Sequence, residues 1–165
     1  MPANKLCNRL INEYGNTIFR MCYLYLKDYH LAEDAAQETF LRAVRAYDSF
    51  VHKSSEKTWL IKIALNCCKN IMRTRWFRFD FANIEDHPDF ADKKNQIDEI
   101  ILKDAISSAI MKLPILDREI ILLYYYEELS LKEMSSIIGK SESAAMKRLS
   151  RARKKIKDIL KEELL

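Results

Sequence analysis

Glycine is scarce in this chain, and this scarcity restricts the possible folds more than any other feature of the sequence. The 165 residues include only two glycines, Gly15 and Gly139, and three prolines. Tight β-hairpin turns usually need glycine, because the backbone there takes a left-handed conformation. Several hairpins would be difficult to build here, whereas the abundant Leu, Ile, Ala, Lys, Glu and Arg all favour helices. We therefore expect an all-α protein.

The stretch from residue 77 to residue 97 interrupts the helical pattern. It contains Pro88 and a run of acidic residues, and its apolar residues show no 3.6-residue period. These features are typical of a linker between domains. We expect two small helical domains, over residues 1–76 and 98–165, joined by a flexible linker over residues 77–97.

Three helices are predicted in the first domain, over residues 5–27, 32–47 and 56–75. Apolar residues recur along each helix at intervals of three or four, which predicts one buried stripe per helix. In chain order, the stripes are Leu6, Leu10, Tyr14, Ile18 and Cys22; Ala36, Phe40, Ala43 and Tyr47; and Trp59, Ile63, Cys67 and Ile71.

Four helices are predicted in the second domain. The first three span residues 98–112, 114–127 and 131–138, and the fourth begins near residue 141. Pro114 suits the first turn of the second helix, where its missing N–H is not needed. A short helix, a turn and a longer basic helix at the end of the chain indicate a helix-turn-helix.

Capping residues mark the turn between the last two helices. Ser130 and Glu133 form a capping box at the start of the short helix. Gly139 can end that helix in a left-handed conformation, and Ser141 can cap the helix that follows. These signals place the helix-turn-helix between residues 130 and 157.

The last helix separates apolar from basic residues. Its predicted core stripe is Ala145, Leu149, Ala152 and Ile156. Residues 140–157 hold eight basic residues against one acid, and Lys147, Arg151 and Lys154 share a second face. Such a face suits the major groove, with Ser143 and Lys147 near base edges and the later basic residues near phosphates. The alternative is a solvated basic face, and the motif alone does not distinguish one class of DNA-binding regulator from another.

Two further helix faces carry polar residues. The face of helix 32–47 opposite its stripe holds Asp34, Gln37, Glu38, Leu41 and Arg45. Periodicity alone favours an ordinary solvated face there, and a docking face for a large protein is the alternative. Helix 56–75 joins Trp59 to a basic end, and aromatic and basic residues together can bind single-stranded DNA. Trp59 itself is expected in the core or at its rim.

Several function classes find no support in the sequence. Two glycines cannot form a phosphate-binding glycine loop, and the H-E-x-x-H and G-x-S-x-G motifs are missing. The cysteines and histidines lack metal-ligand spacing, so neither catalysis nor a metal or cofactor is predicted. No apolar run approaches the roughly 20 residues of a membrane span, and no signal peptide is evident. We expect a cytoplasmic protein whose cysteines are reduced and at least partly buried.

Three segments, in order along the chain, resemble the extracytoplasmic-function (ECF) sigma factors of RNA polymerase. AEDAAQETFLRAVRAYDSF (32–50) resembles the helix that binds core polymerase, and KTWLIKIALNCCKNIMRTR (57–75) resembles the segment that melts and reads the −10 element. Residues 113–156 resemble the domain that reads the −35 element. The resemblance implies a sigma factor that directs promoter recognition and transcription initiation.

The resemblance also implies roles for individual residues. Those implied for core polymerase binding are Asp34, Gln37, Glu38, Phe40 and Leu41. Those implied for the −10 strand are Lys62, Asn66, Lys69, Asn70 and Arg73, and the loop 51–57 would capture a flipped base. Those implied for the −35 duplex are Ser143, Lys147, Arg148, Arg151 and Lys154.

The expected partners follow from the same resemblance. They are core RNA polymerase, promoter DNA and an anti-sigma factor that holds the protein inactive, without direct membrane insertion. The family usually has G-T-V-K-S-R at the start of the recognition helix, whereas this chain has SAAMKR at 143–148, so its promoter preference is expected to differ. A stand-alone dimeric helix-turn-helix regulator is the alternative, and its first domain would have to supply the dimer interface.

Overall fold

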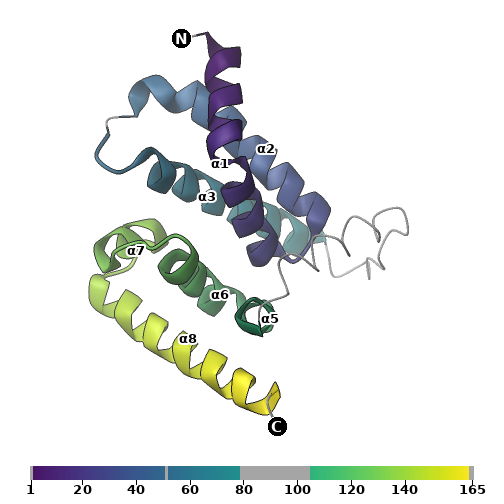
Figure 1. The fold of residues 1–165 in the computed structure, drawn as a ribbon, viewed down its shortest axis with the longest axis vertical. Coiled ribbons are helices and arrows are strands. Elements are labelled where there is room, and N and C mark those ends of the chain that lie inside the picture. Colours follow the sequence, from purple (N-terminus) through teal and green to yellow (C-terminus); the bar gives the residue numbers. More distant parts are fainter. Residues whose placement is uncertain (1, 51, 79–104, 164–165) are drawn as a thin grey trace. The chain divides into compact units, whose positions relative to one another are not determined.

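The computed structural model describes residues 2–50, 52–78 and 105–163. Every regular element within these ranges is helical, in agreement with the predicted all-α fold. The chain divides into two compact units, Met1–Ala82 and Asn83–Leu165, each with its own packed helices (Figure 1). The linker predicted over residues 77–97 lies almost entirely outside the described residues.

Three long helices and one short 3-10 turn form the first unit. They are α1 (Ala3–Leu26), α2 (Tyr29–Ala46), η1 (Tyr47–Ser49) and α3 (Glu56–Arg78). Each of the three long helices packs against the other two (Figure 1). Asp28 starts α2, because its side chain accepts a hydrogen bond from the backbone N–H of Leu31 at 2.9 Å.

The buried stripe of α1 agrees with the sequence prediction. Leu6, Leu10, Ile18 and Cys22 are all buried, while Tyr14 is half-buried. The predicted residues Ala36, Phe40 and Ala43 of α2 are buried as well, and Tyr47 lies at the rim. These two stripes meet because α1 and α2 pack along most of their lengths, and together they form one side of the core.

Of the stripe predicted for α3, only Cys67 is buried. The buried residues are Leu60, Ile61, Ala64, Leu65, Cys67 and Cys68. Trp59, Ile63 and Ile71 are only half-buried. The indole of Trp59 stacks on the ring of Phe50, with ring centroids 4.6 Å apart, at the edge of the unit. The buried face of α3 is therefore rotated relative to the predicted stripe, and only Cys67 belongs to both.

All four cysteines are free thiols. Cys22, Cys67 and Cys68 are buried and Cys7 is half-buried, which confirms the predicted burial. Burial raises the pKa of the Cys67 thiol, so that little of it exists as thiolate. These side chains therefore pack as small apolar groups in the first unit.

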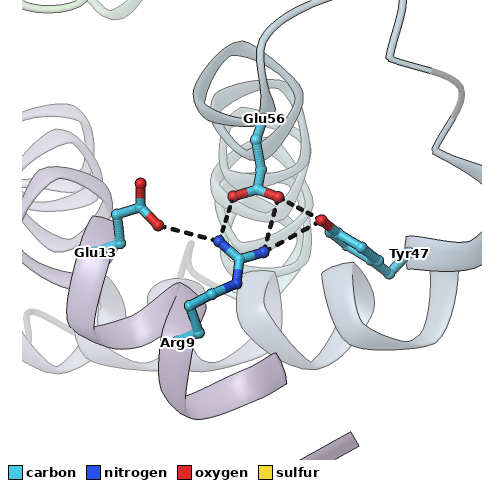
Figure 2. Close-up of polar contacts among 4 residues, drawn as sticks. All are labelled: Arg9, Glu13, Tyr47 and Glu56. Atoms are coloured by element: carbon cyan, nitrogen blue, oxygen red, sulfur yellow. Dashed lines mark hydrogen bonds and ion pairs between the residues drawn. The ribbon is translucent and has the colours of Figure 1, made fainter. Parts of the chain in front are cut away.

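A polar network joins three separate parts of the first unit (Figure 2). The Arg9 guanidinium on α1 donates to both carboxylate oxygens of Glu56, at 2.8 and 2.9 Å. It also donates to the Tyr47 hydroxyl at 3.2 Å, and that hydroxyl donates to Glu56 at 2.6 Å. Glu13 accepts a further hydrogen bond from Arg9 at 3.0 Å. The first residue of α3 is thereby fixed to α1 and to η1.

The network shifts the ionisation of its members. The pKa of Glu56 is lowered to about 2. The hydrogen bonds from Arg9 are the largest cause and the hydrogen bond from the Tyr47 hydroxyl adds to them, while burial acts in the opposite direction. Burial, together with the Glu56 charge, raises the pKa of the neighbouring Tyr14 to about 12. The carboxylate of Glu56 is therefore held in its charged form at neutral pH.

The second unit contains four helices and one π-helical turn within the described residues. They are α5 (Ala105–Met111), α6 (Ile115–Ile121), the π turn η3 (Leu122–Tyr126), α7 (Leu131–Ile138) and α8 (Glu142–Glu163). The long helix α8 packs against α5, α6 and α7 (Figure 1). The start of the helix predicted over residues 98–112 lies outside the described residues, and its described part is α5.

The helix predicted over residues 114–127 is not one regular α-helix. Pro114 occupies the N-cap position just before α6 and is not part of its first turn. Residues Leu122–Tyr126, near the end of the predicted helix, form the π turn. Leu122 and Leu123 are both completely buried there, as are Ile120 and Ile121 at the end of α6. The spacing of apolar residues in the sequence did not predict the π turn.

The predicted caps of the helix-turn-helix are all present. The Ser130 hydroxyl accepts a hydrogen bond from the Glu133 N–H at 3.1 Å, and the Glu133 carboxylate accepts one from the Ser130 N–H at 3.3 Å. Gly139 ends α7 with φ 69° and ψ 32°. The Ser141 hydroxyl accepts a hydrogen bond from the Ala144 N–H at 3.1 Å. The turn between α7 and α8 is therefore determined by its own residues.

Substitution by alanine should change the stability of the protein in opposite directions at the two glycines. A Cβ at Gly139 would meet no atom within 4 Å, but φ 69° strains any other residue, so Gly139→Ala should destabilise the second unit by about 1 kcal/mol. Gly15 lies inside α1, where a Cβ would make an ordinary 3.5 Å contact with Ile11. Gly15→Ala should stabilise the first unit by about 0.5–1 kcal/mol. Thermal denaturation followed by circular dichroism checks both, and equal shifts of the same sign would contradict this assignment.

Removing the Glu56 charge should weaken the first unit in a pH-dependent way. The folded pKa of about 2 lies below the ordinary value of 4.5, so the stabilisation is complete above that value and is lost as the pH falls toward about 2. Glu56→Gln should lower the free energy of unfolding by about 2 kcal/mol at pH 7, allowing for screening at the partly exposed Arg9. Urea unfolding followed by tryptophan fluorescence measures it, since both tryptophans fall within α3.

Glu13→Gln is the matched control for this experiment. The Glu13 side chain is 53% exposed and pairs with Arg9 only along the surface of α1, so its removal should change the free energy of unfolding by less than about 0.5 kcal/mol. Equal losses in the two variants would contradict the central place of Glu56. So would a loss in Glu56→Gln that stays constant down to pH 3.

Candidate nucleic-acid interface

The second unit forms a helix-turn-helix whose later helix is open along one side. Met134 and Ile137 anchor the short helix α7 in the core, and α7 packs against α8. The turn at Gly139 and the cap at Ser141 then direct the chain into α8. Residues 139–144 are all exposed, so the first turn of α8 lies at the surface of the unit.

The two faces of α8 are separated as the sequence predicted. Ala145, Leu149 and Ala152 are buried, and Ile156 is half-buried. The exposed residues on the opposite side are Ser143, Lys147, Ser150, Arg151 and Lys154, with Arg148 half-buried beside them. These positions follow the i, i+4, i+7, i+8, i+11 spacing of one helical face.

Two of the exposed basic side chains of α8 contact other residues of the second unit. The Arg153 Nε donates to the Tyr125 hydroxyl at 3.0 Å, and its guanidinium carbon lies 4.6 Å from the centre of the Tyr124 ring. The Lys155 ammonium donates to an Asp117 carboxylate oxygen at 2.6 Å. These contacts hold α8 against the π turn and α6, and the sequence pattern did not separate them from the other basic residues.

The other basic side chains of the predicted set remain available to a ligand. Within the described ranges, Lys147, Arg148, Arg151 and Lys154 form no ion pair, and three of the four are exposed. Positive charges that lack an internal partner attract phosphates, because the counterions released from nucleic acid drive binding. The structure thus divides α8 into basic residues that stabilise the unit and basic residues that face outward.

The residues predicted to contact the −10 strand share one face of α3. Lys62, Asn66 and Arg73 are exposed, and Lys69 and Asn70 are half-buried. Their spacing places them opposite the buried face formed by Leu60 to Cys68. The Arg73 guanidinium donates to the Asn70 side-chain oxygen, which orders both side chains. The face carries amide and cationic groups together, a combination that can contact both bases and phosphates.

Aromatic rings gather where the loop after η1 enters α3. Phe50 lies between the rings of Trp59, at 4.6 Å, and His52, at 4.3 Å. His52 has a left-handed φ of 55°, and Ser55 caps α3 by accepting a hydrogen bond from the Thr58 N–H at 3.0 Å. The predicted base-capturing loop is thus bordered by stacked rings, although residue 51 lies outside the described residues.

The polar face predicted for α2 lies at the surface, but one residue assigned to it is buried. Asp34, Gln37 and Leu41 are exposed, and Glu38 is half-buried and paired with Arg42 at 2.8 Å. Phe40 is only 5% exposed and belongs to the core, so it cannot present its side chain to a partner as the sequence analysis expected. Leu41, 48% exposed, is the apolar side chain that this face offers.

No pattern in the sequence indicates the Arg9–Glu56 network. Its members lie 47 residues apart, and an acidic residue in a first helical turn is ordinary. The exposure of Met146 on α8 was also not predicted, although Lys147 and Arg148 follow it directly in the sequence. Among the described residues no cluster suited to a metal ion occurs, and none of their helices has the length and apolar character of a membrane span.

Comparison with known families assigns both units. The family described as Sigma-70 region 2 matches residues 10–78, and the family described as Sigma-70, region 4 matches residues 103–156. A dimeric helix-turn-helix regulator is not favoured, because the first unit also matches a sigma-factor region.

Whole-chain relatives give the same result. The chain is 32% identical to the ECF RNA polymerase sigma factor SigM of Bacillus subtilis over 87% of this chain and 88% of the relative. It is 29% identical to SigW of the same organism over 93% and 88% of the two chains. The sigma factor RpoE, solved with the anti-sigma factor NepR from Bartonella quintana, has the same fold, with a TM-score of 0.73, 22% identity and coverage of 93% and 96%.

CnrH, solved in complex with the cytosolic domain of CnrY, is also similar in fold, with a TM-score of 0.65 and 22% identity over 94% of this chain and 88% of that chain. Fold, family regions and whole-chain relatives therefore agree. The chain belongs to the ECF sigma factors of the sigma-70 family, which bind core RNA polymerase and direct promoter recognition and transcription initiation.

Proposed function

We propose that three helix faces divide the work of this sigma factor: α2 docks core polymerase, α3 holds the melted −10 strand and α8 reads the −35 duplex. The observation that supports this most directly is the division of α8. Its buried stripe fixes the helix in the unit, while Lys147, Arg148, Arg151 and Lys154 face outward without an ion-pair partner among the described residues.

In this proposal α8 enters the major groove with its first turns. Ser143 and Lys147 lie nearest the exposed start of the helix, where recognition helices contact base edges. Arg148, Arg151 and Lys154 lie further along and contact phosphates, which set the register of the helix on the duplex. Arg153 and Lys155 take no part, because the tyrosines and Asp117 already occupy them.

The face of α3 contacts the separated −10 strand. Flipping a base out of the stack costs roughly a few kcal/mol, and contacts to the unstacked strand must offset this cost. Lys62, Lys69 and Arg73 supply positive charge, while Asn66 and Asn70 supply hydrogen bonds that can read base edges. The Arg9–Glu56 network fixes the end of α3 that borders the base-capturing loop, and thus orders this site before DNA binds.

The face of α2 contacts core polymerase through Asp34, Gln37, Glu38 and Leu41. A protein interface gains most from an apolar group that becomes fully buried, surrounded by polar groups that set specificity. Leu41 can supply such a group, with Gln37 and Glu38 one helical turn before it and Asp34 two turns before it. Phe40 supports this face from the core without contacting the partner.

The proposal extends to regulation and to location. The fold relatives RpoE and CnrH were solved with NepR, an anti-sigma factor, and with the cytosolic domain of CnrY. We infer that a partner of the anti-sigma kind restrains this chain by covering the faces named above. Its work is binding without catalysis or a cofactor, and it takes place in the cytoplasm, where polymerase and promoter DNA are.

The purified chain should form a stable complex with bacterial core RNA polymerase and create new transcript starts on genomic DNA fragments. Leu41→Arg should weaken that complex at least about tenfold, because it replaces a buried apolar contact with a charge. Equilibrium binding to labelled core polymerase measures the change, and circular dichroism confirms that the variant is folded.

Ile11→Arg is the control, since Ile11 is 44% exposed on α1 and lies outside all three faces. Its affinity for core polymerase should match that of the unmodified chain. Equal weakening by both substitutions would contradict the assignment of α2. A chain that binds duplex DNA tightly as a dimer, without a polymerase complex, would overturn the proposed function itself.

Removing two outward charges from α8 should reduce the salt dependence of promoter binding. Arg151→Ala with Lys154→Ala should lower the slope of log affinity against log salt by about two, roughly one for each lost phosphate contact. Promoter binding by the holoenzyme, titrated at several potassium chloride concentrations, measures the slope. Arg153→Ala is the control: it should leave the slope unchanged and lower the melting temperature, because Arg153 contacts the tyrosines instead of DNA.

A further inference from the structure

We propose that Met146 contacts the 5-methyl group of a thymine in the −35 element and sets the base preference at that position. The inference rests on the proposed role of α8 in reading the −35 duplex. It adds a residue that none of the predicted DNA contacts included, and it assigns that residue one apolar group on the DNA.

Met146 has no role in the core of the second unit. Its side chain is 57% exposed, the highest fraction among the exposed large apolar residues of the described chain. The residues that fix α8 in the unit are Ala145, Leu149 and Ala152, and they are buried on the other side of the helix. Met146 can therefore be changed without opening a cavity in the unit.

The exposed neighbours of Met146 are polar or charged. Glu142 and Ser143 lie one turn before it, Ser150 lies one turn after it and Lys147 lies next to it, and all four are exposed. Exposed apolar residues scattered over a protein surface are ordinary. An apolar side chain among the outward basic residues of a recognition helix is different, because a partner drawn there by charge will cover it.

The chemistry of that partner identifies the contact. The exposed side of α8 carries serines and many more basic residues than acids, Glu142 being the one acid within residues 140–157, and such a surface suits a polyanion better than an apolar protein groove. Among the base edges in the major groove, thymine alone presents a methyl group. The flexible, unbranched thioether of methionine can follow such a methyl over a range of helix positions. The second turn of α8 is near enough to the start of the helix to reach base edges.

Deoxyuridine substitution tests the contact, since uracil keeps the pairing of thymine and lacks only the methyl group. The transcript starts obtained with the holoenzyme define the −35 element, and each thymine on either strand is then replaced singly. For the unmodified chain, one position should weaken holoenzyme binding about fourfold, the value expected for one buried methyl group. For Met146→Ala, the thymine and uracil duplexes should bind equally at that position.

Two further variants sharpen the experiment. Met146→Leu keeps an apolar side chain and should retain part of the preference for thymine. Leu116→Ala removes a side chain of similar exposure, 51%, from α6, and should show the same thymine-to-uracil ratio as the unmodified chain at every position. Both variants keep the outward charges of α8, so general attraction to DNA is unchanged.

Three outcomes would overturn the proposal. In the first, the ratio of affinities for thymine and uracil duplexes is the same for the unmodified chain and Met146→Ala at every position. In the second, the −35 element contains no A·T pair. In the third, Met146→Ala binds core polymerase more weakly in the absence of DNA. The last would assign Met146 to a protein contact. Failure of the proposed function is distinguishable, because no holoenzyme or no promoter-specific binding would then form with the unmodified chain.

Discussion

When a helix buries one stripe of side chains, the directions of its remaining side chains are fixed as well. This constraint governs all three faces that are proposed to bind a partner. The buried side chains of α3 pack against α1 and α2, which turns Lys62, Asn66 and Arg73 outward; the buried residues are Leu60, Ile61, Ala64, Leu65, Cys67 and Cys68. In α8 the small side chains of Ala145 and Ala152 bring the helix close to its neighbours and present the opposite side to solvent. Packing thus orients the binding groups before any partner arrives.

Polar contacts also fix the positions of the helices within each unit. The bidentate pair of Arg9 and Glu56 joins α1 to the first residue of α3, so the loop between η1 and α3 is fixed at its far end. In the second unit, Arg153 and Lys155 perform a similar task, since they attach α8 to the π turn and to α6. Charge in this protein is therefore divided between residues that hold the fold and residues that face outward.

Local features of this fold could be predicted from the sequence, and contacts between distant residues could not. The capping box at Ser130, the left-handed Gly139 and the stripe of α8 each depend on residues within one or two turns, and all are present. The α3 stripe was misplaced because Trp59 pairs with Phe50 at the rim, a contact that helical period does not encode. Phe40 was assigned to the docking face although its neighbours bury it. The roles of the outward residues stay predictions, because their partners lie outside the chain.

The separation of the two faces of α8 also has an evolutionary consequence. Substitutions at exposed positions away from special contacts usually change stability by less than about 0.5 kcal/mol. The outward row, from Ser143 through Lys147 to Ser150, touches none of the residues that hold the helix in place. Mutation can therefore explore new target sequences there while the scaffold is untouched. Duplicated copies of such a chain could diverge to serve different sets of genes long before their folds diverge.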